Sequence, residues 1–406
     1  MWNVQFVMIF AIEVLLQLGM YILQPNLSNY LMMLGASVAA AGFIVGLNYG
    51  TSLILRFVNG FVCDLFDKKA LLVLSCTCFV FASLGISFAV SPAMVGFFRI
   101  IQGVAFVVKS SVVVSVASMV VPKKMVGSGV GVMGLGFTIA CSVGPAIGDF
   151  VGTVYGYRAS CAMAVASFAG ALCVTLAFRA PAASLGSWRN LECGAWKAVK
   201  LQIGRIKLSE LLYAPTLPVT VAIFLAFAAQ SMMLALTLTF ASIQGVPYAS
   251  IYYIAYAAIA VFSKPLAGRM LDKHGVLFVL TPMSLVSCAA MMLLAFDFST
   301  ATLGVAGIMM GLGQGSVWSC LQGEAVRRAP ASKTGRSVNM FYIGSDTTQC
   351  LAPFCFASLF NSFGSSVCFF VAAICVVLSA ISYVLLSRLL CRLKVKSGAA
   401  SARNES

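Results

Sequence analysis

Two long stretches of this chain contain no charged side chain, residues 211–263 and residues 347–387. A helix needs about 20 apolar residues to cross a bilayer, so each stretch is long enough for two crossings. The rest of the chain is similar, since 61% of all residues are hydrophobic and only 9% are charged. One or two soluble cores cannot bury so much apolar surface. We therefore predict an all-α membrane protein, because hydrocarbon offers no partner to an unpaired backbone amide.

Hydropathy predicts twelve transmembrane helices in two groups of six. The expected spans are residues 2–25, 37–62, 70–90, 93–120, 126–151, 158–178, 216–242, 249–268, 276–296, 302–325, 337–361 and 365–388. The first bundle is assigned to residues 1–178 and the second to residues 216–390. A polar linker, residues 179–215, joins them, either as an amphipathic helix on the inner leaflet or as loosely ordered chain. A basic tail, residues 391–406, follows.

Basic residues fall on one side of this arrangement. The net charge is +15, and its lysines and arginines lie in alternate loops, in the linker and in the tail. The opposite loops contain a single basic residue, Arg158. Because cytoplasmic loops are the positive ones, both termini are expected in the cytoplasm and the protein in the plasma (inner) membrane. A basic excess placed in this way does not indicate nucleic acid as a partner.

Neither the cysteines nor the histidine predicts a metal site. The 14 cysteines lie mostly within the expected spans without CxxC spacing, and the one histidine, His274, sits in a turn without a ligand set. The loops leave little room for an enzymatic domain, and no phosphate-binding loop with its lysine is present. We expect no metal, no cofactor, no catalytic residue and no enzymatic activity.

The two groups of helices share a pattern at one fixed offset. Gly60-x-x-x-Asp64 recurs 208 positions later as Gly268-x-x-x-Asp272. The same offset relates Arg56 to Lys264, Gly127 to Gly335, Gly136 to Gly344, and Pro145 to Pro353. Duplicated halves with a binding site between them are the usual construction of secondary transporters.

The loop sequences around this repeat resemble those of the major facilitator superfamily. Residues 60–69, GFVCDLFDKK, and residues 268–275, GRMLDKHG, are similar to the superfamily's motif between helices 2 and 3 and between helices 8 and 9. The resemblance covers essentially the whole chain and implies two six-helix bundles with a cytoplasmic latch. The gating residues it implies are Gly60, Asp64, Lys68, Lys69, Gly268, Arg269 and Asp272. Alternatively, the loop lysines serve only to fix the topology.

Two further motifs extend the resemblance. Arg99, Gln102 and Gly103 match the superfamily's R-x-x-Q-G motif, whose arginine is associated with proton coupling; a buried arginine can also be a structural hydrogen-bond hub. The glycine-rich residues 131–148 with Gly144, Pro145 and Gly148 resemble a pattern typical of antiporters and drug exporters. This favours the drug:proton antiporter branch, although small residues also serve close helix packing in any membrane bundle.

Ionisable residues near the middle of a span are costly in lipid and indicate function. With ~1.5 Å of rise per residue, Glu13, Lys109 and Asp346 fall within about 5 Å of the bilayer midplane, where transporter sites lie. Glu13 can exchange a proton there, or Lys109 can neutralise it as a permanent pair. Nearer the rims we place Arg56, Lys264, Glu324 and Asp149.

These charges, together with amides and aromatic rings, predict a proton and substrate cavity suited to an amphipathic organic solute. Its expected lining residues are Glu13, Gln17, Tyr21, Gln24, Arg99, Lys109, Gln230, Tyr256, Gln314, Trp318, Tyr342 and Asp346. Four of them, Glu13 to Gln24, follow helical spacing and should share one face.

The prediction is a monomeric secondary transporter, in contact with membrane lipid, that works by alternating access. Its expected activity is proton-coupled export of a small organic or drug-like compound. One alternative is an importer or uniporter of a small, anionic metabolite held by Lys109 and Arg99. A second alternative is a transporter-like receptor that binds its ligand without moving it.

Overall fold

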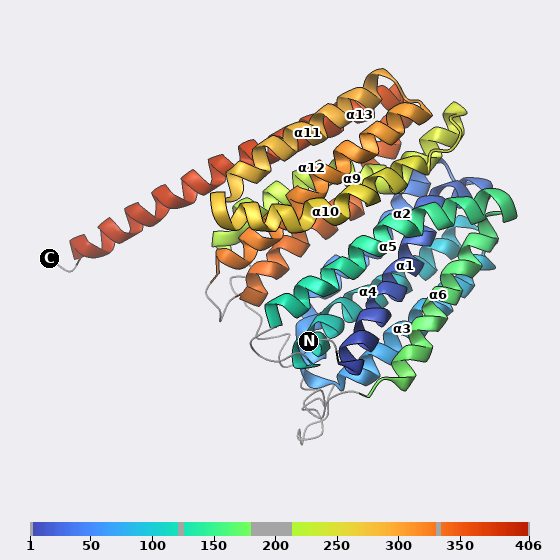
Figure 1. The fold of residues 1–406 in the computed structure, drawn as a ribbon, viewed down its shortest axis with the longest axis horizontal. Helices are drawn as coiled ribbons and strands as arrows, with labels where there is room; N and C mark the ends of the chain where they lie inside the picture. Colours follow the sequence, from blue (N-terminus) through green and yellow to red (C-terminus); the bar gives the residue numbers. More distant parts are fainter. Residues whose placement is uncertain (1–2, 121–125, 180–212, 330–333, 405–406) are drawn as a thin grey trace.

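The computed structural model describes residues 3–120, 126–179, 213–329 and 334–404, and almost all of these residues are helical (Figure 1). The first half contains α1 (Val4–Met33), α2 (Val38–Leu65), α3 (Lys68–Ser87), α4 (Pro92–Val120), α5 (Val126–Tyr155) and α6 (Tyr157–Ala177). The second half contains the 3₁₀ turn η4 (Ala214–Thr216), α9 (Leu217–Gln244), α10 (Ile251–His274), α11 (Val276–Phe296), α12 (Thr300–Arg327) and α13 (Thr334–Asn404).

The longest helix, α13, is two helical arms joined at Gly364. This glycine has φ 81°, a backbone conformation that other residues rarely adopt, and no connecting loop is needed. With this break, the described segments are consistent with twelve helices in two groups of six. Gly156, between α5 and α6, turns the chain in the same way with φ 89°. Gly156 and Gly364 are also 208 positions apart, so the sequence repeat is visible in the backbone.

Side-chain caps define where several helices begin. Asn3 accepts a hydrogen bond from the backbone N–H of Phe6 at 2.7 Å, and Asp67 accepts from the N–H groups of Lys69 and Ala70. Ser299 forms a capping box with Thr302 at the start of α12. Each cap satisfies a backbone donor that the first helical turn leaves free.

Nine of the described helical segments are long and apolar enough to cross a membrane. The main difference from the expected spans is at α1, which continues through Pro25 to Met33 instead of ending near residue 25. Proline is tolerated there because neighbouring helices in a membrane bundle can satisfy the freed backbone group. Most of the expected linker lies outside the described residues.

The helices alternate in direction, so their ends gather at two opposite ends of the bundle. We call the end with Lys68, His274 and Arg327 the basic end, and the end with Gly156 and Gly364 the distal end. The two halves lie beside each other (Figure 1) and meet along two helix pairs, α2 with α13 and α5 with α10. We call these pairs the two seams.

The α2/α13 seam is close because glycines of α2 face the backbone of α13. A Cβ atom at Gly42 would collide with the carbonyl of Pro353, and one at Gly46 would collide with the carbonyl of Cys350. Small residues of this kind let two membrane helices approach closely, and here they join the first half to the second.

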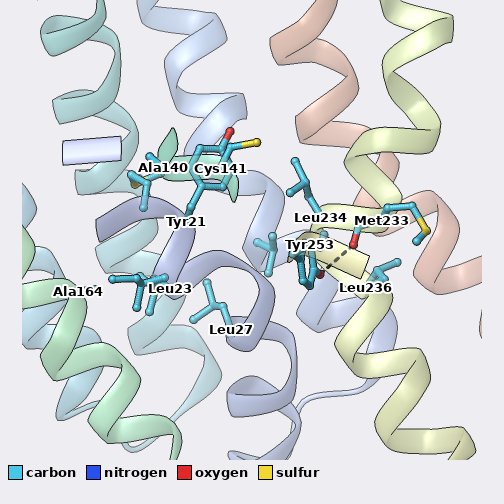
Figure 2. Packing of buried hydrophobic residues seen from close by; sticks show 14 of the residues in the cluster. Tyr21, Leu23, Leu27, Ala140, Cys141, Ala164, Met233, Leu234, Leu236 and Tyr253 are labelled. Carbon is cyan, nitrogen blue, oxygen red and sulfur yellow. Dashed lines mark hydrogen bonds between the residues drawn. The ribbon is translucent and has the colours of Figure 1, made fainter. Parts of the chain in front are cut away.

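At the distal end the halves also meet through α1 and α9. All residues from Gly19 to Leu31 and from Ala229 to Ala241 are buried. The Ser28 hydroxyl donates to the carbonyl of Ala235 at 3.2 Å. Figure 2 shows this packing, including Leu23, Leu27 and Leu234, and the hydrogen bond from the Tyr253 hydroxyl to the Met233 carbonyl.

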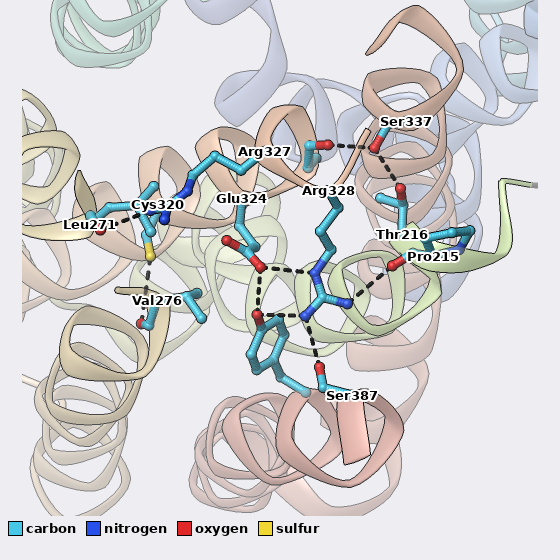
Figure 3. Close-up of polar contacts among 12 residues, drawn as sticks. Pro215, Thr216, Leu271, Val276, Cys320, Glu324, Arg327, Arg328, Ser337 and Ser387 are labelled. Carbon is cyan, nitrogen blue, oxygen red and sulfur yellow. Dashed lines mark hydrogen bonds and ion pairs between the residues drawn. The ribbon is translucent and has the colours of Figure 1, made fainter. Parts of the chain in front are cut away.

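At the basic end, Arg328 ties three parts of the second half together (Figure 3). Its guanidinium donates to Glu324 at 2.8 Å, to the Tyr383 hydroxyl at 2.7 Å and to the carbonyl of Pro215 at 3.0 Å. A further hydrogen bond reaches Ser387. Because these partners belong to α12, the last arm of α13 and the residues before α9, this network fixes the basic end of the second bundle.

Candidate functional site

A buried ion pair in the first half joins α1 to α4. The ammonium group of Lys109 donates to both carboxylate oxygens of Glu13, at 2.9 and 3.0 Å. Gln17, one turn along α1, donates its amide to the same carboxylate at 2.8 Å. Both charged residues are buried, and a charge in such a place is tolerated only with a partner.

A second ion pair crosses between the halves. Arg56 of α2 forms an ion pair with Asp346 of α13, with Nε of Arg56 2.9 Å from Oδ2 of the carboxylate. The Ser52 hydroxyl donates a hydrogen bond to the same oxygen. The guanidinium also lies over the ring of Tyr342, 5.2 Å from its centroid. The sequence analysis placed Arg56 near the rim and Asp346 near the midplane, whereas the ion pair brings their charged groups to one level.

The other seam carries the counterpart of Arg56 in the repeat, Lys264 of α10. Its ammonium nitrogen lies 5.1 Å from the ring centroid of Phe137 on α5. Phe137 stacks on Trp318 of α12 with a centroid separation of 5.8 Å and an interplanar angle of 10°. The repeated pair Arg56 and Lys264 therefore act reciprocally, since each places its cation over an aromatic ring of the opposite half.

Contacts between α1 and α5 bring Glu13 near the ring that Lys264 covers. Gly136, next to Phe137, packs on α1 so that a Cβ there would be 3.5 Å from Cγ of Glu13. The ring of Tyr21 lies 5.6 Å from that of Phe137. We use the name central belt for Glu13, Arg56, Lys109, Lys264 and Asp346.

The remaining expected cavity residues fall into two groups. Gln24 accepts a hydrogen bond from Tyr49, and Arg99 donates to the carbonyl of Val45 and to Gln102, as a structural hub would. Gln230, Gln314 and Tyr256 are buried, and Oε1 of Gln230 and both amide atoms of Gln314 have no hydrogen-bond partner among the described residues.

The gating residues implied by the loop motifs are only partly visible. The surroundings of Gly60 and Asp64 lie outside what the structure describes. Lys68 is buried, whereas Lys69 donates to the carbonyl of Leu176. In the second copy, Arg269 and Asp272 are exposed, and a Cβ at Gly268 would meet nothing within 4 Å.

The glycine-rich part of α5 packs on α1. A Cβ at Gly144 would lie 2.7 Å from Cβ of Tyr21, and one at Gly148 would collide with the carbonyl of Ile22. Pro145 lies inside the helix between them. These glycines therefore allow α5 to approach α1 closely, which serves packing whatever else they do.

Sequence reasoning did not name Phe137, and it placed Arg56 and Lys264 near the rims, outside the expected cavity. The repeat had already related Arg56 to Lys264 by its offset, but nothing in the sequence indicated the aromatic partners of their side chains. Among the described residues, no three His, Cys, Asp or Glu side chains are grouped as a metal site would require.

Two similar helical bundles with buried ion pairs within and between them define a polytopic membrane protein of the transporter class. The sequence profile of the Major Facilitator Superfamily matches residues 9–353 and, in a second match, residues 219–403. The chain belongs to this superfamily.

Solved structures of other transporters share its fold. A POT family transporter in complex with a thioalcohol-conjugated peptide matches with a TM-score of 0.75 and 11% identity, over 94% of this chain and 96% of that one. The nucleoside transporter NupG matches with a TM-score of 0.71 and 13% identity, over 94% of this chain and 99% of that one. No curated protein matches in sequence. At such identities the similarity establishes the fold alone.

Proposed function

We propose that the chain is a secondary transporter that moves a small organic solute by alternating access, in exchange for protons. The central belt carries this proposal, because it places two carboxylates and three bases in the interior of a bundle whose halves meet along two seams. A protein that served only as a scaffold would have little reason to keep such groups in lipid.

Coupling is assigned to Glu13 and Lys109. Since Lys109 bonds to both oxygens of Glu13, a proton arriving at Glu13 must replace that ion pair, and the loss of the pair frees the lysine. Protonation would then change the contacts between α1 and α4, beside the helices that form the seams. Such a differential contact is what an ion needs in order to shift a conformational equilibrium.

Export is the proposed direction, supported by the resemblance of α5 to the glycine-rich helix of exporters. Import of an anionic metabolite is the second candidate. One observation favours it: Glu13 and Asp346 each bond to a base, so neither carboxylate is displayed to a cationic solute.

The test uses proteoliposomes loaded with the pH dye pyranine, under a pH gradient of either sign. The panel contains an arylsulfonate, a dipeptide, a nucleoside and a lipophilic cation, with protein-free liposomes as the control. At least one class of compound should change the internal pH, and Glu13→Gln should abolish the change. The proposal is wrong if folded, incorporated protein responds to none of them, and the sign of the gradient that supports flux gives the direction.

A further inference from the structure

The two oxygens of the Glu13 carboxylate differ in how many hydrogen bonds they accept. Oε1 accepts two, from the amide of Gln17 at 2.8 Å and from the ammonium of Lys109 at 3.0 Å. Oε2 accepts one among the described residues, from Lys109 at 2.9 Å. Since a carboxylate oxygen has two lone pairs, both lone pairs of Oε1 are occupied, whereas Oε2 keeps one for a proton.

Gln17 and Lys109 hold the carboxylate from different helices. Gln17 follows Glu13 by four residues on α1, so that helical geometry places its amide beside Oε1. Lys109 comes from α4, where its ammonium also lies 5.6 Å from the ring centroid of Phe106. If the ion pair is lost, Gln17 stays with Glu13 on α1, and Lys109 keeps the face of Phe106 on its own helix.

The carboxylate is enclosed by protein. Glu13 is 7% exposed, and α5 packs against its stem through Gly136, which has no side chain. Two further titratable groups, Tyr21 of α1 and Tyr342 of α13, lie within its electrostatic range. Both are phenols, which stay neutral below about pH 10. Lys109 therefore supplies the positive charge that stabilises the ionised carboxylate.

We infer that Gln17 is a positioning residue for proton binding, and that the proton binds Oε2 of Glu13. Gln17 holds Oε1 and so fixes the orientation of the carboxylate, while Oε2 takes a proton from solvent. An O–H bond forms at Oε2, the carboxylate becomes a neutral acid, and Lys109 keeps its own protons and its charge. Oε1 is then the carbonyl oxygen of the acid, still bonded to Gln17. This inference rests on the proton-coupled transport proposed above.

Infrared spectroscopy of the purified full chain tests this inference, because it detects the C=O stretch of a protonated carboxyl group and needs no solute. Difference spectra between high and low pH are recorded, and the band of Glu13 is the one that Glu13→Gln removes. The amplitude of this band against pH gives the midpoint of protonation. The test variants are Gln17→Leu and Gln17→Met, which cannot donate a hydrogen bond. Gln5→Leu, at a half-buried amide on the same helix, is the matched control.

We expect the midpoint to rise by about one pH unit in both Gln17 variants. A hydrogen bond to an ionised carboxylate is stronger than one to the neutral acid, so its loss favours protonation. The C=O band should also move to higher frequency, because Oε1 loses the donor that weakens its bond to carbon. Gln5→Leu should change neither quantity, and the melting temperature of each variant verifies its fold.

An unchanged midpoint in folded Gln17→Met would overturn the inference, as would a shift of equal size in Gln5→Leu. A band that stays in place or moves to lower frequency would overturn the assignment of the proton to Oε2. The inference also fails if no Glu13 band appears at any pH at which the chain stays folded. In each case a pH response to a compound in the proteoliposome assay would leave the transport function standing.

Discussion

The two charges of the Glu13–Lys109 pair depend on each other. Removing one partner leaves the other charge buried, which typically costs about 3–5 kcal/mol, whereas removing both leaves no charge behind. We expect Glu13→Ala and Lys109→Ala each to lower the melting temperature in detergent substantially. The double variant should lower it by less than the sum of the two single decreases. Arg158→Ala, at an exposed distal position, is the control. Additive losses would show that the two side chains act independently.

The sequence alone left open whether Glu13 and Lys109 are paired. Depth along a helix predicted that they share a level, but it does not give the direction in which each helix turns its side chain. Depth also placed Arg56 and Asp346 at different levels, because it was measured at the backbone, whereas their side chains meet in an ion pair. The residue patterns thus predicted which groups are buried, whereas the contacts between helices decided which of them meet.

Among the secondary-structure elements, the glycines of α2 give a sharp test of how the seam is held. A methyl group at Gly46 would collide with a backbone carbonyl of α13, while one at Gly96 would lie 3.5 Å from Cδ1 of Leu47, an ordinary contact. Gly46→Ala should therefore force α2 and α13 apart and lower both yield and transport, whereas Gly96→Ala should be nearly neutral. Equal behaviour of the two variants in a melting assay would argue against close packing at the seam.

Arg328 allows a prediction about the second bundle. A hydrogen bond to a charged group makes a net contribution of about 1.5–3 kcal/mol to stability. Arg328→Ala should therefore destabilise the second half by several kcal/mol. Arg327 is exposed and donates a hydrogen bond to the carbonyl of Leu271, so Arg327→Ala is the matched control. Limited proteolysis of residues 213–404 measures the difference, and similar cleavage rates in both variants would contradict the prediction.

The helix boundaries show how accurately hydropathy predicts where a helix begins and ends. The expected span 276–296 coincides with α11, because its ends carry clear signals: a glycine before it and a polar turn after it. The predicted end of the first span, residue 25, was wrong, because the helix continues through Pro25 to Met33 among neighbouring helices. The break in α13 was predicted as a separation between two spans, and the structure shows that a single glycine makes it.

For the molecule as a whole, Arg56 and Asp346 form an ion pair that links the two halves. In a chain with a protease site inserted within residues 180–212, the two halves should stay together in detergent after cleavage. Asp346→Asn should lower the temperature at which they separate, because Arg56 then keeps a charge without its counter-ion. Asp272→Asn, at an exposed acid, should not. Gel filtration across a temperature series measures this, and identical separation in both variants would show that the pair does not hold the halves.

The reciprocal seams have a mechanical consequence. In the proposed alternating-access cycle, the α2/α13 and α5/α10 seams stay closed, and one half rocks against the other about the axis that joins them. In that proposed cycle, residues on the axis keep their neighbours, while the α1 and α9 contacts at the distal end separate. Strengthening or weakening the helix packing at a seam should therefore change the rates of the forward and reverse conformational changes equally. It should leave the affinity for the solute almost unchanged.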